Sequence, residues 1–256
     1  MRATPALDTY SDRYDGEYIL RQKKTTIITN AKKPRTLANL SKIYLNVKDR
    51  CWRKYMYQFG HELYHYTDGN LEEYVRHQWF AETIAEMHSL FVLDVLAKKW
   101  ERDAPYSNWM DYASSIREYC EYAINDDNIG IHGHELAEFF KSHRESLEKN
   151  PYIRYNKATK ELEDVDDNDK IRFVNVFSPI LYEEVFKKDY NSWEALKVLH
   201  KIGQCKELSF EEYINKWYDQ CDDNNKKVVA KVASILEIDL LTRPEILDRA
   251  NEISIL

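Results

Sequence analysis

The sequence predicts an α+β protein, in which a small N-terminal sheet packs on two helices and a mainly helical region follows. Short runs of β-branched and aromatic residues occupy the first 47 positions, whereas apolar residues recur at spacings of three and four from residue 52 onward. Glycine and proline are scarce, with six of each among 256 residues, which disfavours an all-β or loop-rich fold. The change of period near residue 47 therefore marks where the sheet gives way to helices.

Three short segments of the N-terminal region are predicted to be strands, at 17–21 (EYILR), 25–29 (TTIIT) and 42–47 (KIYLNV). The polar segment 30–41 (NAKKPRTLANLS) is predicted to be a loop between the second and the third. We therefore expect a sheet of two or three strands.

The first helix is predicted to begin near Asp49 and to end at the turn-forming residues 67–70 (TDGN). Its apolar face is formed by Trp52, Tyr55, Met56, Phe59 and Leu63.

A second, long helix is predicted over 71–100, and the acidic stretch 160–169 is predicted to be a solvated loop. We place the boundary between two subdomains after residue 104, giving a first subdomain over 1–104 that contains the short sheet and two helices, and a helical subdomain over 105–256. Further helices are predicted over 107–125, 131–149, 170–188, 191–203, 209–221 and 224–237.

Composition and charge disfavour several functions. The net charge of −7 provides no overall basic field for nucleic acid, and no run of 18 apolar residues predicts membrane insertion. The four cysteines form no C-x-x-C pair, so neither a zinc ribbon nor a redox motif is indicated. Sparse cysteines suit a reducing compartment, and we expect a cytoplasmic protein, although the sequence leaves open a leader that is removed. Nothing in the sequence indicates an oligomeric state.

The segment His61-Glu62-Leu63-Tyr64-His65 matches the pattern H-E-x-x-H. Residues four apart lie on one face of a helix, so the two imidazoles can bind one ion. A glutamate directly after the first ligand can take a proton from metal-bound water. This single helical turn therefore offers two ligands and a general base.

A third ligand can come from the next helix. Catalytic zinc usually keeps three protein ligands and one open position for water. Glu82 and Glu86 are four residues apart, on the same stripe as the apolar Trp79. Two carboxylates on a partly apolar stripe are costly unless they are paired or bind a metal, so both are candidates.

At these residues the chain resembles the gluzincins, the zinc metallopeptidase clan that includes the thermolysin-like enzymes. The resemblance covers about residues 42–90 and rests on H-E-x-x-H, a turn, and a helix with glutamate followed four residues later by an acid. It implies that His61, His65 and Glu82 bind one Zn²⁺, that Glu62 is the general base, and that Glu86 orients His61 from outside the metal. It also implies a peptide or protein substrate.

Other classes of metallopeptidase fit less well. A metzincin would need glycine at position 68 and histidine at position 71, where this chain has Asp68 and Leu71. The zinc peptidases that cleave phage repressors also combine H-E-x-x-H with a glutamate helix and remain possible relatives. Two further alternatives stay open: a zincin-like protein without activity, and a helical interaction protein in which HELYH is accidental.

A peptidase of this kind also needs a group that stabilises the oxyanion of the tetrahedral intermediate. The sequence offers two histidines near a second GHEL tetrapeptide and two tyrosines of the helical region. The candidates are His132, His134, Tyr119 and Tyr182.

Overall fold

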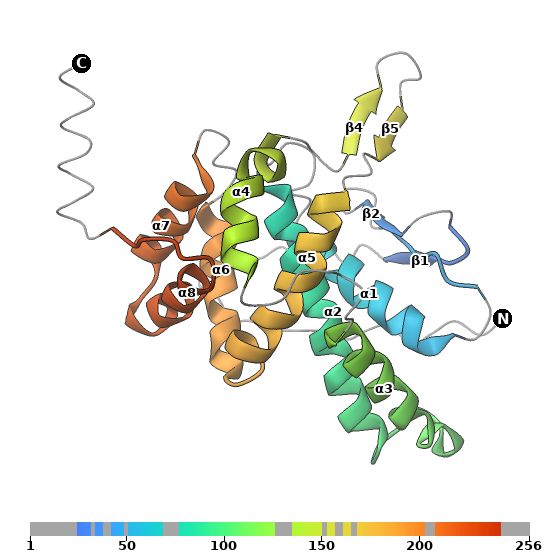
Figure 1. Ribbon diagram of the computed structural model, residues 1–256. Coiled ribbons are helices and arrows are strands. Elements are labelled where there is room, and N and C mark those ends of the chain that lie inside the picture. The colour runs from blue at the N-terminus through green and yellow to red at the C-terminus, as the bar shows by residue number, and fades with distance from the viewer. Residues whose placement is uncertain are drawn as a thin grey trace, which may run out of the picture.

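The computed structural model describes residues 25–31, 34–37, 42–48, 51–68, 77–125, 135–149, 153–156, 161–164, 168–202 and 208–241. Within these ranges the protein has eight α-helices and five short strands, and a three-stranded sheet precedes the first helix (Figure 1). The predicted α+β class, with a small N-terminal sheet and a mainly helical remainder, is confirmed.

The N-terminal sheet consists of β1 (Thr26–Ile28), β2 (Arg35–Leu37) and β3 (Lys42–Tyr44), in the order β1-β3-β2. β3 lies in the centre, parallel to β1 and antiparallel to β2. The predicted strand at 25–29 is confirmed over residues 26–28 and the one at 42–47 over residues 42–44, whereas the one at 17–21 lies outside the described residues. The prediction of a loop over 30–41 is wrong for β2. This three-residue segment is a strand because it pairs with β3, and the polar residues around it give no local indication of that pairing.

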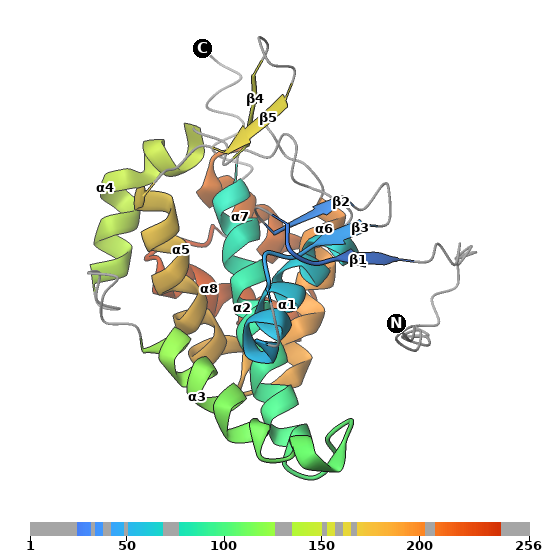
Figure 2. The same cartoon turned by 90° about the vertical axis from the view of Figure 1, so that its right-hand side faces the viewer.

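One face of the sheet packs on helix α1 (Trp52–Asp68) (Figure 2). Side chains two residues apart on a strand share a face, so Ile43 and Leu45 point the same way. Both are almost fully buried, and with Val47 they form a hydrophobic cluster. The partly buried residues packed against this cluster are Cys51, Tyr55, Phe59 and Tyr66.

Helix α2 (Gln78–Trp100) packs along α1 in the antiparallel direction, since residues late in α1 contact residues early in α2. The predicted start of this helix at residue 71 lies outside the described residues. The helices approach closely at Gly60, where a Cβ would lie 3.1 Å from Cα of Ser89 and 3.2 Å from Cβ of Val92. A side chain at this position would require these neighbours to shift by a few tenths of an ångström.

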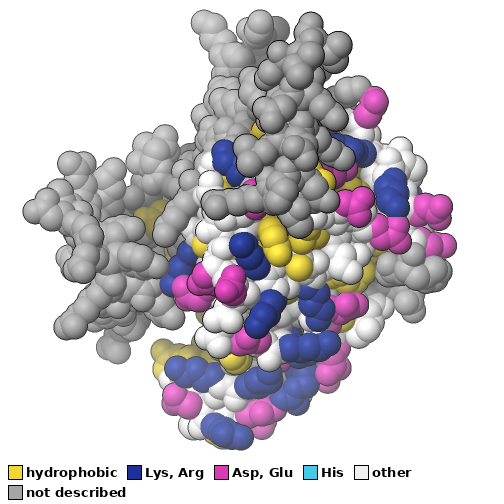
Figure 3. Space-filling model, turned by 90° about the vertical axis from the view of Figure 1, so that its left-hand side faces the viewer, with side chains coloured by type: hydrophobic (Ala, Val, Ile, Leu, Met, Phe, Trp, Pro, Cys, Tyr) yellow, Lys and Arg dark blue, Asp and Glu magenta, His cyan; other side chains and the backbone are white. Residues whose placement is uncertain are grey.

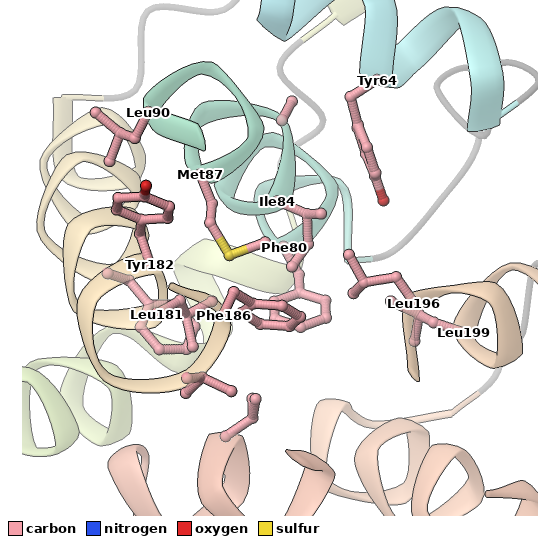
Figure 4. Packing of buried hydrophobic residues seen from close by; sticks show 14 of the residues in the cluster. Tyr64, Phe80, Ile84, Met87, Leu90, Leu181, Tyr182, Phe186, Leu196 and Leu199 are labelled. Carbon is pink, nitrogen blue, oxygen red and sulfur yellow. The ribbon is translucent and has the colours of Figure 1, made fainter. Parts of the chain in front are cut away.

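Several of the later helices pack against α2, which contributes many residues to the main hydrophobic core. Figure 4 shows Phe80, Ile84 and Met87 of α2 directed toward residues of the later helices, while Tyr64 reaches the same core from α1. The later helices are α3 (Tyr112–Ile124), α4 (Leu136–Lys149), α5 (Asn168–Leu181), α6 (Glu194–Ile202), α7 (Phe210–Gln220) and α8 (Asp223–Ile235). Short 3₁₀ turns span Ser107–Trp109 and Tyr190–Trp193, and a π-helical turn spans Tyr182–Phe186.

A separate hairpin of β4 (Ile153–Asn156) and β5 (Glu161–Asp164) extends from the helical part (Figure 1). The prediction of a solvated loop over 160–169 is therefore wrong for 161–164. Acidic residues are unfavourable in strands, so the local sequence did not indicate β5, whose strand structure comes from antiparallel pairing with β4.

On the face shown in Figure 3, basic and acidic side chains are interspersed. Among the described residues, no helix combines the length and the apolar character needed to cross a membrane.

Candidate metal centre

Helices α1 and α2 bring together one atom each from His61, His65 and Glu82. The Nε2 atoms of His61 and His65 are 3.1 Å apart. The Oε2 atom of Glu82 lies 3.2 Å from Nε2 of His61 and 3.6 Å from Nε2 of His65. Among the described residues, this is the one group of three or more His, Cys, Asp or Glu side chains close enough to hold a metal ion.

These separations can be tested against the geometry of a real ion. Zinc binds imidazole nitrogen and carboxylate oxygen at about 2.0–2.2 Å in tetrahedral sites, which places neighbouring ligand atoms about 3.4 Å apart. The three observed distances, from 3.1 to 3.6 Å, lie on either side of that value. The three atoms therefore lie at separations that allow them to share a single metal ion.

The charges of the group point to a cation as well. Burial alone would lower the pKa of His61, but the carboxylates of Glu82 and Glu86 outweigh it and raise the pKa well above its ordinary value of 6.5. Burial alone would raise the pKa of Glu82, but His65 and His61 outweigh it and hold the pKa well below 4.5. Without a metal, protons must supply the positive charge that this site attracts.

A carboxylate on the far side of His61 fixes how this imidazole is presented. Oε2 of Glu86 lies 3.2 Å from Nδ1 of His61. When Nδ1–H donates to Glu86, the lone pair of Nε2 is left for the metal. Glu86 also acts on Tyr57, a residue of α1 whose pKa is raised well above its ordinary value by burial and by this carboxylate. Glu86 therefore interacts with both Tyr57 and His61, next to the metal site.

Glu62 projects from α1 toward the sheet and not toward solvent. Its side chain is buried, with 3% of the residue exposed. The hydroxyl of Thr36 in β2 lies 2.7 Å from Oε2 of Glu62 and 2.8 Å from its backbone carbonyl oxygen. Burial raises the pKa of Glu62, while His61, His65 and Thr36 act in the opposite direction without cancelling the rise.

Thr36 is the residue of this site that sequence reasoning missed. Its signal was weak, because the segment around it is polar and its strand is only three residues long. A β-branched threonine beside Leu37 was the one local indication of a strand.

A hydrogen bond next to the metal site helps to fix the position of α1 relative to α2. Nδ1 of His88 lies 2.7 Å from the carbonyl oxygen of Gly60, the residue before the first candidate ligand. A carbonyl oxygen only accepts, so Nδ1–H of His88 is the donor, and burial lowers the pKa of this imidazole. The close approach at Gly60 and this hydrogen bond together set how near α1 comes to Glu82.

The candidates for stabilising the oxyanion lie in different places. Tyr119 of α3 packs edge-on against Tyr57, with ring centroids 5.7 Å apart, so it lies at the Glu86 end of the site. Tyr182 donates a hydrogen bond to Asp94, twelve residues after Glu82 and thus about 18 Å along α2, and Figure 4 shows it on the side of α2 near Leu90. The structure therefore does not bring Tyr182 to the triad. His132 and His134 lie outside the described residues.

Comparison with known proteins does not assign the chain to a class. No protein-family model matches it, and neither a curated protein nor a solved structure matches it. The site itself therefore supports one general statement, that His61, His65 and Glu82 form a group able to hold one metal ion.

Proposed function

We propose that the protein is a zinc-dependent peptidase, in which His61, His65 and Glu82 bind one Zn²⁺ and Glu62 is the general base. The observation that carries this proposal is the convergence of two imidazole nitrogens and one carboxylate oxygen at tetrahedral separations, next to a buried glutamate. Three protein ligands with an open fourth position are typical of catalytic zinc, whereas structural zinc usually has four.

The residues divide the chemistry among them. Zinc held at this site would polarise the scissile carbonyl and lower the pKa of water. Glu62 would accept a proton from that water and pass it to the leaving amine, and the raised pKa of its buried carboxyl suits both steps. Glu86 would keep the Nδ1 proton of His61, so that the ligand nitrogen stays unprotonated.

A second candidate function is a zinc-holding protein without hydrolytic activity. It is favoured by the state of Glu62, which is almost entirely buried and already accepts a hydrogen bond from Thr36. In this case the metal would stabilise the α1–α2 pair and no substrate would reach the base.

The substitution Glu62→Gln separates these functions. The purified protein should hold zinc at one ion per chain, and it should cleave a quenched fluorescent peptide library in a reaction blocked by a zinc chelator. The Glu62→Gln variant should retain zinc and lose about 10²- to 10⁴-fold in turnover, the usual contribution of a general base. A matched control is Glu135→Gln, because Glu135 is the exposed glutamate of the second GHEL tetrapeptide, and this variant should cleave like wild type.

Each alternative outcome has a distinct meaning. A wild-type protein that takes up no zinc, even when zinc is supplied, contradicts both functions. Stoichiometric zinc without hydrolysis supports the non-catalytic candidate. If the Glu62→Gln variant cleaves as fast as wild type, Glu62 is not the base.

A further inference from the structure

We infer that Thr36 is a positioning residue for Glu62: its hydroxyl holds one carboxylate oxygen, so that the other is presented for proton transfer. This inference rests on the proposed peptidase function. It extends that function to a strand outside the two metal-binding helices, one that the metal-binding motif itself does not include.

The strand β2 directs Thr36 at α1. Thr36 is paired with Ile43 in the antiparallel register, and directly opposed residues share a face of the sheet. Ile43 is 1% exposed and belongs to the cluster that packs on α1, and Thr36 itself is 2% exposed. The hydroxyl of Thr36 is therefore fixed between the sheet and the helix and is not a mobile surface group.

The hydroxyl has one hydrogen and two acceptors within reach, both from Glu62. A carboxylate accepts more strongly than a carbonyl, so Oε2 of Glu62 is the preferred partner. Among the described residues, Thr36 is the one hydrogen-bond donor that the structure shows for this carboxylate. The bond fixes the final torsion of a side chain that would otherwise rotate, and it leaves Oε1 without a hydrogen bond from the described part of the chain.

A general base has to be held in one position to work efficiently. Proton transfer requires the base within hydrogen-bond distance of the water, and errors of about 1 Å in placement can reduce rates by about 100-fold. A buried carboxylate with a single donor has one preferred orientation. Loss of that donor would leave the ligands in place but release the base.

The chain offers a matched control on the same sheet. Thr25, directly before β1, donates from its hydroxyl to the hydroxyl of Tyr66 in α1 over 3.0 Å. This second link between sheet and helix has the same residue type, but it does not involve Glu62. A loss of activity specific to Thr36 would therefore not come from a general loosening of the sheet.

The test compares Thr36→Val, Thr36→Ser and Thr25→Val in the zinc-loaded full chain, with one cleavable fluorescent peptide. Valine keeps the shape of threonine without the hydroxyl, and we expect kcat to fall about 10- to 100-fold, while zinc stoichiometry stays that of wild type and KM is largely unchanged. Thr36→Ser keeps the hydroxyl and should restore most of kcat, and Thr25→Val should behave like wild type. If valine impairs folding, Thr36→Ala also removes the hydroxyl and takes its place.

A second measurement does not depend on activity. In the metal-free protein, Thr36→Val should lower the urea midpoint of unfolding when Glu62 is present, because a buried carboxylate loses its donor. In the Glu62→Leu background the hydroxyl keeps only the backbone carbonyl of residue 62 as an acceptor, so the same substitution should lower the midpoint by clearly less. A midpoint that falls equally in both backgrounds would show that the two side chains do not interact.

The outcomes separate this inference from the proposed function. If wild type and Thr25→Val cleave, and Thr36→Val cleaves with the same kcat, the positioning role is overturned while the peptidase stands. Equal loss in Thr36→Val and Thr36→Ser also overturns it, because the hydroxyl then makes no difference. If wild type binds zinc but hydrolyses nothing, the proposed function fails and the positioning role fails with it.

Discussion

Replacing Gly60 with alanine is expected to separate α1 from α2 and to weaken metal binding. A Cβ at this position would lie 3.1 Å from Cα of Ser89, and 3.2 and 3.3 Å from Cβ and Cγ2 of Val92. The Cα of Ser89 is backbone and cannot rotate aside, and valine is stiff about its first side-chain torsion. The two helices must therefore move apart by a few tenths of an ångström.

Two opposing effects decide the stability of this variant. Alanine is better than glycine in a helix interior by about 1 kcal/mol, whereas overpacking a buried contact costs about 1–3 kcal/mol. We expect the packing cost to win, with a net loss of roughly 1 kcal/mol and a lowering of the unfolding temperature by about 2–4 °C. His61 and Glu82 come from the two helices that separate, so zinc affinity should fall about tenfold, or about 1.4 kcal/mol.

The assay pairs thermal unfolding of the metal-free protein with a zinc titration against a chromophoric chelator. Lys54, an exposed residue of α1, provides the control, because comparing Lys54→Ala with Lys54→Gly measures the helix preference alone. If Gly60→Ala raises the unfolding temperature as much as that comparison predicts, and zinc affinity stays unchanged, the helices tolerate the methyl group and the reasoning is refuted.

Two further predictions concern the groups around the metal site. Tyr57→Phe removes the hydroxyl whose pKa burial and Glu86 raise well above its ordinary value, and it should lower zinc affinity about tenfold, as is usual for partners of a ligand. Tyr119→Phe, which removes the neighbouring hydroxyl, is the control, and equal losses of zinc affinity in the two variants would contradict the prediction. In the metal-free protein, the interactions that depress the pKa of Glu82 stabilise the fold fully at pH values above 4.5, the ordinary pKa of this residue. The interactions that raise the pKa of His61 stabilise the fold fully at pH values below 6.5, the ordinary pKa of that residue. The unfolding temperature of wild type should therefore exceed that of Glu82→Gln most between pH 4.5 and 6.5. The difference should shrink as acid protonates Glu82 and as base deprotonates His61, and a difference that does not vary with pH would rule out this coupling.

The part of the site that was predictable from sequence is the part set by helical spacing. His61 and His65 face the same way because four residues make about one turn, and that holds wherever the helix lies. The convergence of Glu82 on them depends on the antiparallel crossing of α1 and α2, which local sequence does not determine. It was expected through the resemblance to gluzincins, and the structure places the three atoms close enough to share a metal.

The part that was missed depends on pairing between distant segments. β2 is three residues long, and its strand structure comes from β3. Without β2, nothing in the sequence connects Thr36 to Glu62, 26 residues later. The acidic strand β5 was missed for the same reason, since its local composition favours a loop while its partner β4 supplies the hydrogen bonds.

The metal ligands and the general base are positioned by different parts of the fold, so variants in the two parts should have different effects. The ligands are placed by the α1–α2 pair, through the close approach at Gly60 and the bond from Glu86 to His61. The base is placed by the sheet, through Thr36. Changes in the helix pair should therefore reduce metal affinity and turnover together, whereas loss of the Thr36 hydroxyl should reduce turnover alone. A Thr36→Val variant that loses zinc as readily as Gly60→Ala would show instead that the sheet supports the ligands as well, and that the site behaves as one unit.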